Sequence, residues 1–597
     1  MKPLKTTVFN FAKNILFRKN GWLVLIIIFS LAINLTGLRW GLPSQSLNQL
    51  YFNGENAVQN RIDAIKKQPA EETYKWMGFY LATHPDEAQK KLSRSWYNPI
   101  RSYHPDEYFV IKSLATMNPK TFDLNPHQFT VGGAYLYLTA LMTFLLSKIG
   151  WVKLTGDVGF YFLHPEEMAK LYLTGRLVTA LYGVGIVWLA YLIAKKIWRS
   201  EKAGILSGFL AAVSPLILLN AHYMYVDIPG VFWITAAIYL AVRISAATDK
   251  PGWHKYFLMG IFSGLATGNK IPFFISLLIP FVSIFQKRKL LQKNGVVSGM
   301  LWGSAGFLTV LFVTNPYLFL TFPKPLVELG EQTSLTFSGL LYLKSLVFGL
   351  GCPLVVFSII GLIYCLFRKK NRETCSVPTC WIIVFFFFIS LFGKHFARYI
   401  LPIIPALIFV SVGFWVEPSS GRTVNFLKKA TIVFVSGFTF LYGMAYLSLF
   451  WKENTRTLAG EWIKKNIPAG ATIGVTEVPW QYQMAPLDEN RYQLKITGYD
   501  LKKLETVLPD YFIISSFQGK IAPVPEQMSE EKNLFWNEFE KSKKYQALVS
   551  FRQPLSFAGI VFNQNGASED LIYLNPTIAV FEKTRLPRRK SAPRNDK

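Results

Sequence analysis

Apolar segments of membrane-spanning length recur along the first three quarters of this chain of 597 residues. A hydrocarbon core about 30 Å thick requires roughly twenty consecutive apolar residues in a helix. Such segments lie at Trp22–Leu38, Val131–Leu146, Leu171–Ile193, Ile205–Tyr223, Gly230–Ala241, Tyr256–Leu265, Pro272–Phe285, Val296–Leu320, Cys352–Phe367, Trp381–Phe392, Tyr399–Trp415 and Thr431–Phe450. This repetition predicts a polytopic α-helical membrane protein.

The positive charges indicate how the chain crosses the membrane. The net charge is +28, but the lysines and arginines cluster in short segments between apolar ones, as at Lys195-Lys196, Gln286–Lys289 and Arg368–Lys370. This distribution follows the positive-inside rule and argues against nucleic-acid binding. All three clusters lie in the cytoplasm only if Val131–Leu146 is re-entrant or interfacial, so we predict about eleven spans.

This layout predicts the domain organisation and the location. The N-terminus (1–21) is expected in the cytoplasm, followed by a transmembrane domain (22–452) whose loop 39–130 faces the outside of the plasma membrane. An extracytoplasmic α/β domain (453–584) and a basic, disordered tail (585–597) complete the chain. The four cysteines show no zinc spacing, and a disulfide framework is not expected.

The C-terminal domain carries strand and helix signals instead of membrane segments. A helix containing Leu458, Trp462 and Ile463 on one face is expected to end before Pro468, and a second helix is expected at Glu530–Lys544. Strands are expected at Ala471–Val475, Tyr511–Ser515, Ala547–Phe551 and Thr577–Phe581.

The tetrapeptide His-Pro-Asp-Glu occurs twice in the first external loop, at His84–Glu87 and His104–Glu107. An Asp-Glu pair in a polar loop is most often solvated or lies at a helix N-terminus, and the first copy fits that interpretation. The second copy is flanked by aromatic residues and precedes an apolar helix. A partly desolvated carboxylate there would suit a general base.

Further stretches around the second copy resemble the GT-C superfamily of glycosyltransferases, most closely its family 39, protein-mannosyltransferase-like branch. They are Arg39–Leu42, His104–Val110, Asp123–Pro126 and Tyr135–Leu138. The resemblance implies a polytopic enzyme that transfers a sugar from a polyprenyl- or dolichyl-phosphate carrier on the extracytoplasmic face. It also implies that Asp106 is the catalytic base, with Glu107 as its neighbour and His104 in support. The copy at Asp86 departs from the family pattern and leaves open which copy acts.

Two further residues are candidates for the same site as Asp106. Asp227 precedes Pro229 at the start of an apolar segment, which is equally the pattern of a helix N-cap. The family tends to place an Asp here. Lys270 follows Gly268-Asn269 at an external boundary, where it either snorkels to the interface or contacts a lipid phosphate. Arg176, by contrast, is expected to anchor the external end of a helix.

The segment Lys394–Pro405 places three potential cations on an external loop, against the positive-inside bias. An arginine presents a rigid fork that grips phosphate oxygens. Arg-Tyr-x-Leu-Pro-x-x-Pro resembles a family pattern near the carrier phosphate. Arg398 is therefore the donor-phosphate candidate, with Lys394, His395 and Tyr399 in support; interfacial anchoring is the alternative.

Together with these residues, the resemblance implies an inverting transfer of a lipid-phosphate-linked sugar to an acceptor hydroxyl on a protein, a lipid or a glycan. Asp106, Glu107 and Asp227 would permit a divalent cation, Mg²⁺ or Mn²⁺, without requiring one. The alternatives are a lipid or glycan transporter or flippase without transferase activity, and a membrane scaffold. A transporter usually places ionisable residues inside its spans, whereas here the charges gather at the ends of the apolar segments.

Overall fold

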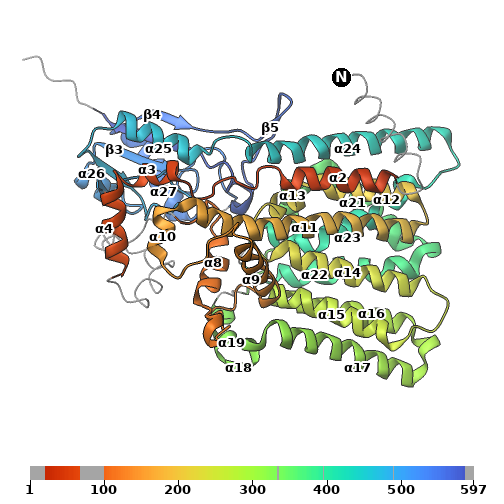
Figure 1. The fold of residues 1–597 in the computed structure, drawn as a ribbon. Helices are drawn as coiled ribbons and strands as arrows, with labels where there is room; N and C mark the ends of the chain where they lie inside the picture. Colours follow the sequence, from red (N-terminus) through yellow and green to blue (C-terminus); the bar gives the residue numbers. More distant parts are fainter. Residues whose placement is uncertain are drawn as a thin grey trace, which may run out of the picture.

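A bundle of long helices forms the part of the chain up to residue 450, and a smaller part with a β-sheet covers one end of the bundle (Figure 1). The computed structural model describes residues 21–66, 100–331, 335–393, 395–488, 490–526 and 528–584. The basic tail, most of the predicted cytoplasmic N-terminus and the first His-Pro-Asp-Glu copy lie outside the described residues.

The predicted apolar segments form the helices of the bundle. The bundle contains α2 (Gly21–Leu35), α11 (Pro165–Trp198), α12 (Glu201–Val213), α13 (Pro215–Ala221), α14 (Asp227–Ser245), α15 (Trp253–Asn269), η3 (Ile271–Leu277), α16 (Leu278–Gln286), α17 (Arg288–Thr314), α20 (Gly339–Leu350), α21 (Cys352–Phe367), α22 (Arg372–Ser390), η5 (Ala397–Ile403), α23 (Ile404–Val416) and α24 (Arg422–Leu449). Shorter helices fill the connections: α3 (Gln45–Tyr51), α4 (Glu55–Lys66), α8 (Glu107–Thr116), η2 (Pro119–Thr121), α9 (Gly133–Lys148), α10 (Val158–Leu163), α18 (Pro316–Leu320) and α19 (Lys324–Glu331).

Fewer of these helices have full membrane length than the sequence predicted. Among the described residues, six helices are long and apolar enough to cross a membrane, or up to eight if each of two bent pairs is one span. The bends are 56° between α12 and α13 and 114° between α20 and α21. The count falls short of eleven because α2, α15 and the segment Ile271–Gln286 are shorter than a crossing requires. The number of crossings therefore stays a prediction.

Glycines set the position of α9, the segment expected to be re-entrant or interfacial. Gly132 donates its N–H to the carbonyl of Asn269 at 3.1 Å, and a Cβ on Gly132 would lie 2.2 Å from that oxygen. Gly133 likewise donates to the Asn315 side chain at 2.7 Å. The two glycines thus lie at the start of α9 instead of interrupting it. Gly132 lets that start contact the end of α15, and Gly133 lets it contact the end of α17.

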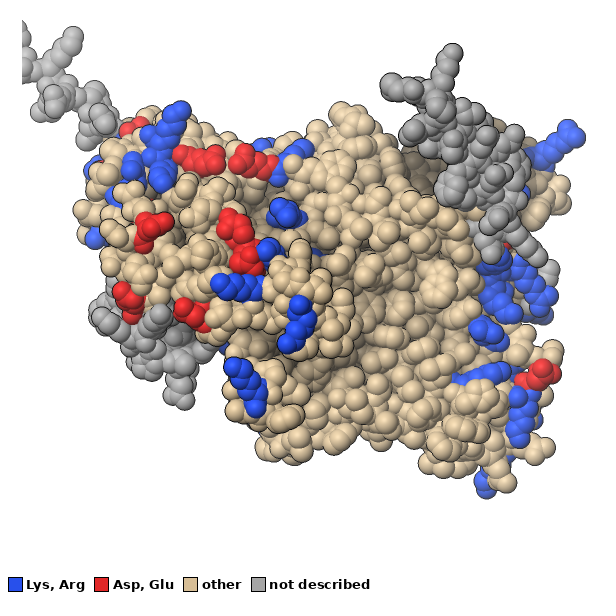
Figure 2. Space-filling model, viewed as in Figure 1, with Lys and Arg blue, Asp and Glu red and all other residues tan. Residues whose placement is uncertain are grey.

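Lysine and arginine side chains gather at the end of the bundle that lies away from the β-sheet, and the surface between the two ends is almost free of charge on the face in Figure 2. The last turn of α11, with Lys195 and Lys196, and the start of α17, with Arg288 and Lys289, contribute to this basic end. The pattern is typical of a membrane protein with that end in the cytoplasm.

The C-terminal part contains a five-stranded sheet of order β2-β1-β3-β7-β4. Its strands are β1 (Thr472–Val475), β2 (Gln493–Ile496), β3 (Tyr511–Ser515), β4 (Tyr545–Phe551) and β7 (Ile578–Lys583), with helices α25 (Thr455–Asn466), α26 (Leu501–Val507) and α27 (Glu530–Ser542). A hairpin, β5 (Ser556–Phe557) with β6 (Ile560–Val561), lies beside α24 (Figure 1). The four predicted strands and both predicted helices are confirmed. The sequence analysis missed β2, although its four residues alternate between polar and apolar, the pattern of a half-buried strand.

One buried arginine joins the C-terminal part to the loop that follows α2. Arg456 of α25 has 0% exposure and donates to the carbonyls of Tyr482 at 3.1 Å and Tyr573 at 2.7 Å. Its guanidinium lies 5.0 Å from the ring centroid of Tyr103, whose hydroxyl is 3.0 Å from that of Thr457. The loop that carries the acidic motif is therefore held against the C-terminal part.

Candidate active site

Asp106 and Arg398 form an ion pair at the end of the bundle that the C-terminal part covers. Asp106 immediately precedes α8 but makes no side-chain cap, so its carboxylate is free to point away from the helix. Its Oδ2 lies 2.8 Å from Nη2 of Arg398, which sits in the first turn of η5. The side chains are 17% and 6% exposed. The two residues that the sequence analysis chose as base and phosphate ligand are thus brought together.

A second ion pair lies beside the first. Lys270, directly after α15, places its Nζ 2.7 Å from Oδ1 of Asp227, and the other oxygen of Asp227 is 3.8 Å from Nε of Arg398. Asp227 is the first residue of α14, where a carboxylate is favoured by the helix dipole. Val226 is the N-cap residue of α14, so Asp227 lies one position inside the helix and not at the N-cap itself.

A third carboxylate comes from the C-terminal part, from the short helix η6 (Glu569–Leu571). Oδ1 of Asp570 accepts the backbone N–H of Ala397 at 3.0 Å, and Oδ2 accepts that of Arg398 at 2.9 Å. Oδ2 is also 3.7 Å from Nη1 of Arg398. The sequence analysis missed Asp570, since Ser-Glu-Asp-Leu reads as an ordinary helix start. Asp106, Asp227, Lys270, Arg398 and Asp570 are called the ionic cluster below.

The guanidinium of Arg398 is buried but not fully hydrogen-bonded. Within the described residues, its Nε and Nη1 donate to no acceptor, and Oδ2 of Asp106 and Oδ2 of Asp227 accept no hydrogen bond. The contacts of the Arg398 Nε and Nη1 atoms with the carboxylates are therefore ion pairs without hydrogen-bond alignment, whereas Lys270 donates a hydrogen bond to Asp227 at 2.7 Å. A buried donor without an acceptor costs about 1–3 kcal/mol. Each free N–H group forms a parallel fork with Nη2, so a ligand with two acceptor oxygens would fit once Asp106 leaves Nη2.

Tyr399 and His104 support the cluster. The Tyr399 ring lies 4.3 Å from Nζ of Lys270 and 5.4 Å from the guanidinium carbon of Arg398, so it faces both cations. The His104 ring packs on Tyr223 with centroids 4.0 Å apart, and its Nδ1 accepts the N–H of Asp106 at 3.3 Å. Burial lowers the pKa of His104 to about 3, so the ring stays neutral and can accept that bond.

Glu107 is directed away from the cluster. Its side chain is 0% exposed and binds the guanidinium of Arg176 through both oxygens, each at 2.7 Å. It also accepts from the Ser102 hydroxyl at 2.5 Å and the Met224 N–H at 2.7 Å. Burial raises the pKa of Glu107, but Arg176 outweighs it and holds the pKa below its usual value. Arg176 lies inside α11, so its expected place at a helix end is wrong.

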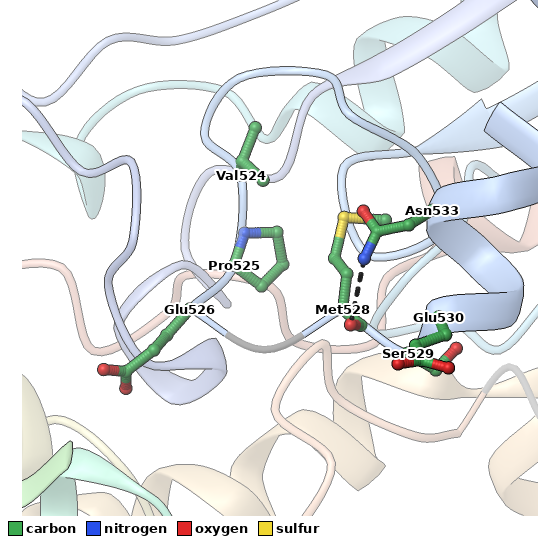
Figure 3. Close-up of a pocket in the computed structure, with 7 residues that line it drawn as sticks. All are labelled: Val524, Pro525, Glu526, Met528, Ser529, Glu530 and Asn533. Carbon is green, nitrogen blue, oxygen red and sulfur yellow. Dashed lines mark hydrogen bonds between the residues drawn. The ribbon is translucent and has the colours of Figure 1, made fainter. Parts of the chain in front are cut away.

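His395 also points elsewhere. Its Nδ1 is 3.3 Å from Oε2 of Glu526, and its Nε2 is 2.8 Å from the Ser345 hydroxyl. Glu526 is one of the residues that line a cavity of about 810 Å³ in the C-terminal part (Figure 3). The other lining residues belong to the same loop and to the start of α27. The structure thus does not bring His395 to Arg398. Lys394 and Asp86 lie outside the described residues.

The carboxylates do not fit the expected divalent cation. In the described parts of the chain, no three His, Cys, Asp or Glu side chains form a group that could hold a metal ion. Asp106 and Asp227 already face Arg398 and Lys270, and Glu107 is bound to Arg176. Cations of the protein thus occupy the places that Mg²⁺ or Mn²⁺ would take.

Residues 135–325 match the family described as dolichyl-phosphate-mannose-protein mannosyltransferase. This match confirms the resemblance that the sequence motifs indicated. It spans Arg176, Asp227 and Lys270, whereas Asp106 and Arg398 lie outside it.

Two curated proteins are similar to this chain over part of their length. An uncharacterized protein of Aquifex aeolicus (strain VF5) is 23% identical over 393 residues, which are 60% of this chain and 66% of that protein. Dolichyl-phosphate-mannose--protein mannosyltransferase 1 of Candida albicans is 25% identical over 250 residues, which are 38% of this chain and 27% of that protein. The chain therefore covers less than two thirds of the length of either relative.

Two solved structures are also similar. ArnT from Cupriavidus metallidurans, bound to undecaprenyl phosphate, has 13% identity and a TM-score of 0.40, with 94% of this chain and 98% of that chain covered. The archaeal oligosaccharyltransferase AglB from Archaeoglobus fulgidus, in complex with an inhibitory peptide and a dolichol-phosphate, has 12% identity and a TM-score of 0.38, with 84% and 77% covered.

Proposed function

Because residues 135–325 match the dolichyl-phosphate-mannose-protein mannosyltransferase family, we propose that this protein is a membrane glycosyltransferase with a lipid-phosphate-linked sugar as its donor. The sugar passes from a polyprenyl- or dolichyl-phosphate carrier to a hydroxyl group of an acceptor protein, lipid or glycan. The reaction inverts the anomeric carbon, and Asp106 is its general base.

The observation that carries this proposal is the 2.8 Å contact between Asp106 and Arg398 beside two unpaired N–H groups of the guanidinium. A phosphodiester offers the acceptor oxygens that Nε and Nη1 lack. Its negative charge competes with Asp106 for Arg398. Among the three carboxylates that face Arg398, that of Asp106 is the most exposed. The backbone N–H of Arg398 donates to Asp570 and not to Asp106. Donor binding therefore releases Asp106 toward the acceptor.

The transfer forms one bond to the anomeric carbon and breaks another. The acceptor oxygen attacks the anomeric carbon and loses its proton to the carboxylate of Asp106. The bond between that carbon and the phosphate oxygen breaks, and its electron pair stays on the carrier phosphate, which gains one negative charge. Arg398 stabilises that developing charge in a largely dehydrated site. Lys270, 2.7 Å from Asp227, adds positive charge beside it.

Glu107 takes a positioning role in this scheme, although the motif suggested a catalytic one. Its carboxylate is fully engaged in bonds with Arg176, Ser102 and Met224. These bonds fix the loop that carries Asp106. No step needs a divalent cation, since Arg398 and Lys270 supply the positive charge.

We further propose that the site opens to the extracytoplasmic side of the plasma membrane. Asp106, Asp227 and Arg398 lie at helix starts at the end of the bundle that the C-terminal part covers, away from the basic end (Figures 1 and 2). The positive-inside bias then puts the N-terminus in the cytoplasm and the C-terminal part outside.

The test is a transfer assay on the purified protein with dolichyl-phosphate mannose and with polyprenyl-phosphate sugars extracted from the host membranes. Asp106→Asn and Arg398→Gln are expected to lower the rate at least about 100-fold, because each removes a group needed in the transition state. Asp123→Asn, on the same loop with a side chain 47% exposed, and Arg288→Gln, at the basic end, serve as matched controls.

Near wild-type transfer by Asp106→Asn would remove the base assignment. A wild-type protein that moves lipid-linked sugars across vesicles but transfers none to any acceptor would support the transporter alternative and overturn the proposal.

A further inference from the structure

The C-terminal part supplies a residue to the proposed site that nothing in the sequence motifs assigns. Asp570 lies 172 residues beyond Arg398 along the chain, yet its carboxylate accepts the N–H of Arg398 at 2.9 Å. Resting on the proposed function, we infer that Asp570 is a positioning residue: it fixes the first turn of η5 and thereby aims the Arg398 guanidinium at the donor phosphate.

The start of η5 needs an acceptor from elsewhere. The first N–H groups of a helix have no partner inside it, and the N-cap residue Phe396 has no polar side chain to supply one. Asp570 accepts from both Ala397 and Arg398, and the Ser568 hydroxyl oxygen lies 3.1 Å from the Ala397 N–H. Ser568 in turn donates to Asp570 at 2.5 Å. A carboxylate is the strongest acceptor available for such groups.

Asp570 fixes the backbone of Arg398 without filling its side-chain donors. The distance from Oδ2 to Nη1 is 3.7 Å, too long for a hydrogen bond, whereas Asp106 approaches Nη2 to 2.8 Å. A phosphodiester can therefore bind the parallel N–H groups of Nη2 and either Nε or Nη1 while Asp570 stays in place, once Asp106 has left Nη2. The partner that must leave is Asp106. The geometry thus separates one carboxylate that holds Arg398 from one that reacts.

The segment that carries Asp570 is itself fixed. Arg456 donates to the carbonyl of Tyr573 at 2.7 Å, and Asn575 donates to the side chain of Gln564 at 2.8 Å. Both bonds are buried, so η6 is anchored on either side. The C-terminal part thereby sets the position of Arg398, and the site is incomplete without it.

The experiment compares Asp570→Ala and Asp570→Asn with the wild type for transfer rate and for binding of polyprenyl phosphate, the lipid product. Because misplacing a charged group by about 1 Å can cost about 100-fold, Asp570→Ala is expected to lose about 100-fold in rate and about 10-fold in lipid affinity. Asp570→Asn keeps one acceptor oxygen and is expected to lose less.

Asp510→Asn is the matched control. Asp510 lies just before β3 and accepts hydrogen bonds from the N–H and the hydroxyl of Thr472, at 2.9 and 2.6 Å. At the other end of β3, Ser515 precedes Ser516, whose N–H donates to the carbonyl of Thr577. This variant weakens the C-terminal part without touching η5, so its rate and lipid affinity are expected to stay unchanged. If Asp570→Ala does not fold, Asp570→Asn and Ser568→Ala decide the question.

The outcomes distinguish the two proposals. Wild-type affinity and rate in the Asp570 variants, together with loss in Arg398→Gln, would overturn the inference and leave the proposed function intact. Equal losses in Asp570→Asn and Asp510→Asn would also overturn it, because they would show a general effect of a weakened C-terminal part. Neither transfer nor lipid binding by the wild type would instead overturn the proposed function.

Discussion

At the scale of single residues, two adjacent carboxylates of one motif have opposite surroundings. Asp106 meets Arg398 in an ion pair that is partly exposed, whereas Glu107 is enclosed and fully hydrogen-bonded. A dipeptide cannot distinguish these cases, because the partners Arg398 and Arg176 come from distant helices. The sequence predicted that the motif matters. The structure shows that the carboxylate of Asp106 belongs to the ionic cluster and that the carboxylate of Glu107 is structural.

The Glu107–Arg176 pair is expected to stabilise the fold. Removing one partner of a buried ion pair leaves an unpaired buried charge and costs about 3–5 kcal/mol. Glu107→Gln is therefore expected to lower the unfolding temperature strongly, as measured by thermal unfolding in detergent. The matched control is Glu167→Gln, which breaks a half-exposed pair with Lys170 and is expected to cost at most about 1 kcal/mol.

The pH dependence of this pair has a defined sign. The pKa of Glu107 in the folded protein lies below the ordinary value of 4.5. Its stabilisation is thus fully present above pH 4.5 and is lost as the pH falls through the folded pKa. Equal stability of Glu107→Gln and wild type at pH 7 would contradict this account.

At the scale of elements, close backbone contacts position the residues of the site. Lys270 follows α15, and the carbonyl before it accepts the N–H of Gly132 at 3.1 Å. The sequence showed the Gly132-Gly133 pair but not which elements it contacts, because a close backbone approach at a glycine can be recognised only when the neighbouring element is known. The start of α9 approaches the end of α15 because Gly132 has no side chain, and it approaches the end of α17 because Gly133 has none.

Gly132→Ala is expected to separate α9 from α15 and to move Lys270. Its Cβ would lie 2.2 Å from two backbone carbonyl oxygens, which cannot move aside as a flexible side chain would. We expect the transfer rate to fall by about 10- to 100-fold, with a lower unfolding temperature. Gly437→Ala in α24, where a Cβ meets nothing within 4 Å, is the control. A wild-type rate in Gly132→Ala would show that this contact does not position the site.

At the scale of the whole molecule, the basic end and the ionic cluster lie at opposite ends of the bundle (Figures 1 and 2). Transfer outside the cell therefore requires that the two ends face opposite sides of the membrane. In a variant without the four native cysteines, Lys120→Cys in η2 should react with a membrane-impermeant maleimide on intact cells. Lys289→Cys at the start of α17 should react only after lysis. The reverse pattern would place the site in the cytoplasm.

The sequence by itself determined the helices, four of the five strands of the large sheet, and the family resemblance. These depend on local apolar length, local strand propensity and short motifs, all of which lie within a few residues of one another. It also selected Asp106 and Arg398 as candidates for the site, because each belongs to a motif with its own chemistry.

Only the tertiary structure decided which of these residues meet. It paired Glu107 with Arg176, turned His395 toward Glu526, and brought Asp570 to Arg398 from 172 residues away. The physical reason is that a buried charge takes whichever opposite charge or N–H group the packing of distant elements places beside it. No local pattern in the chain records that choice.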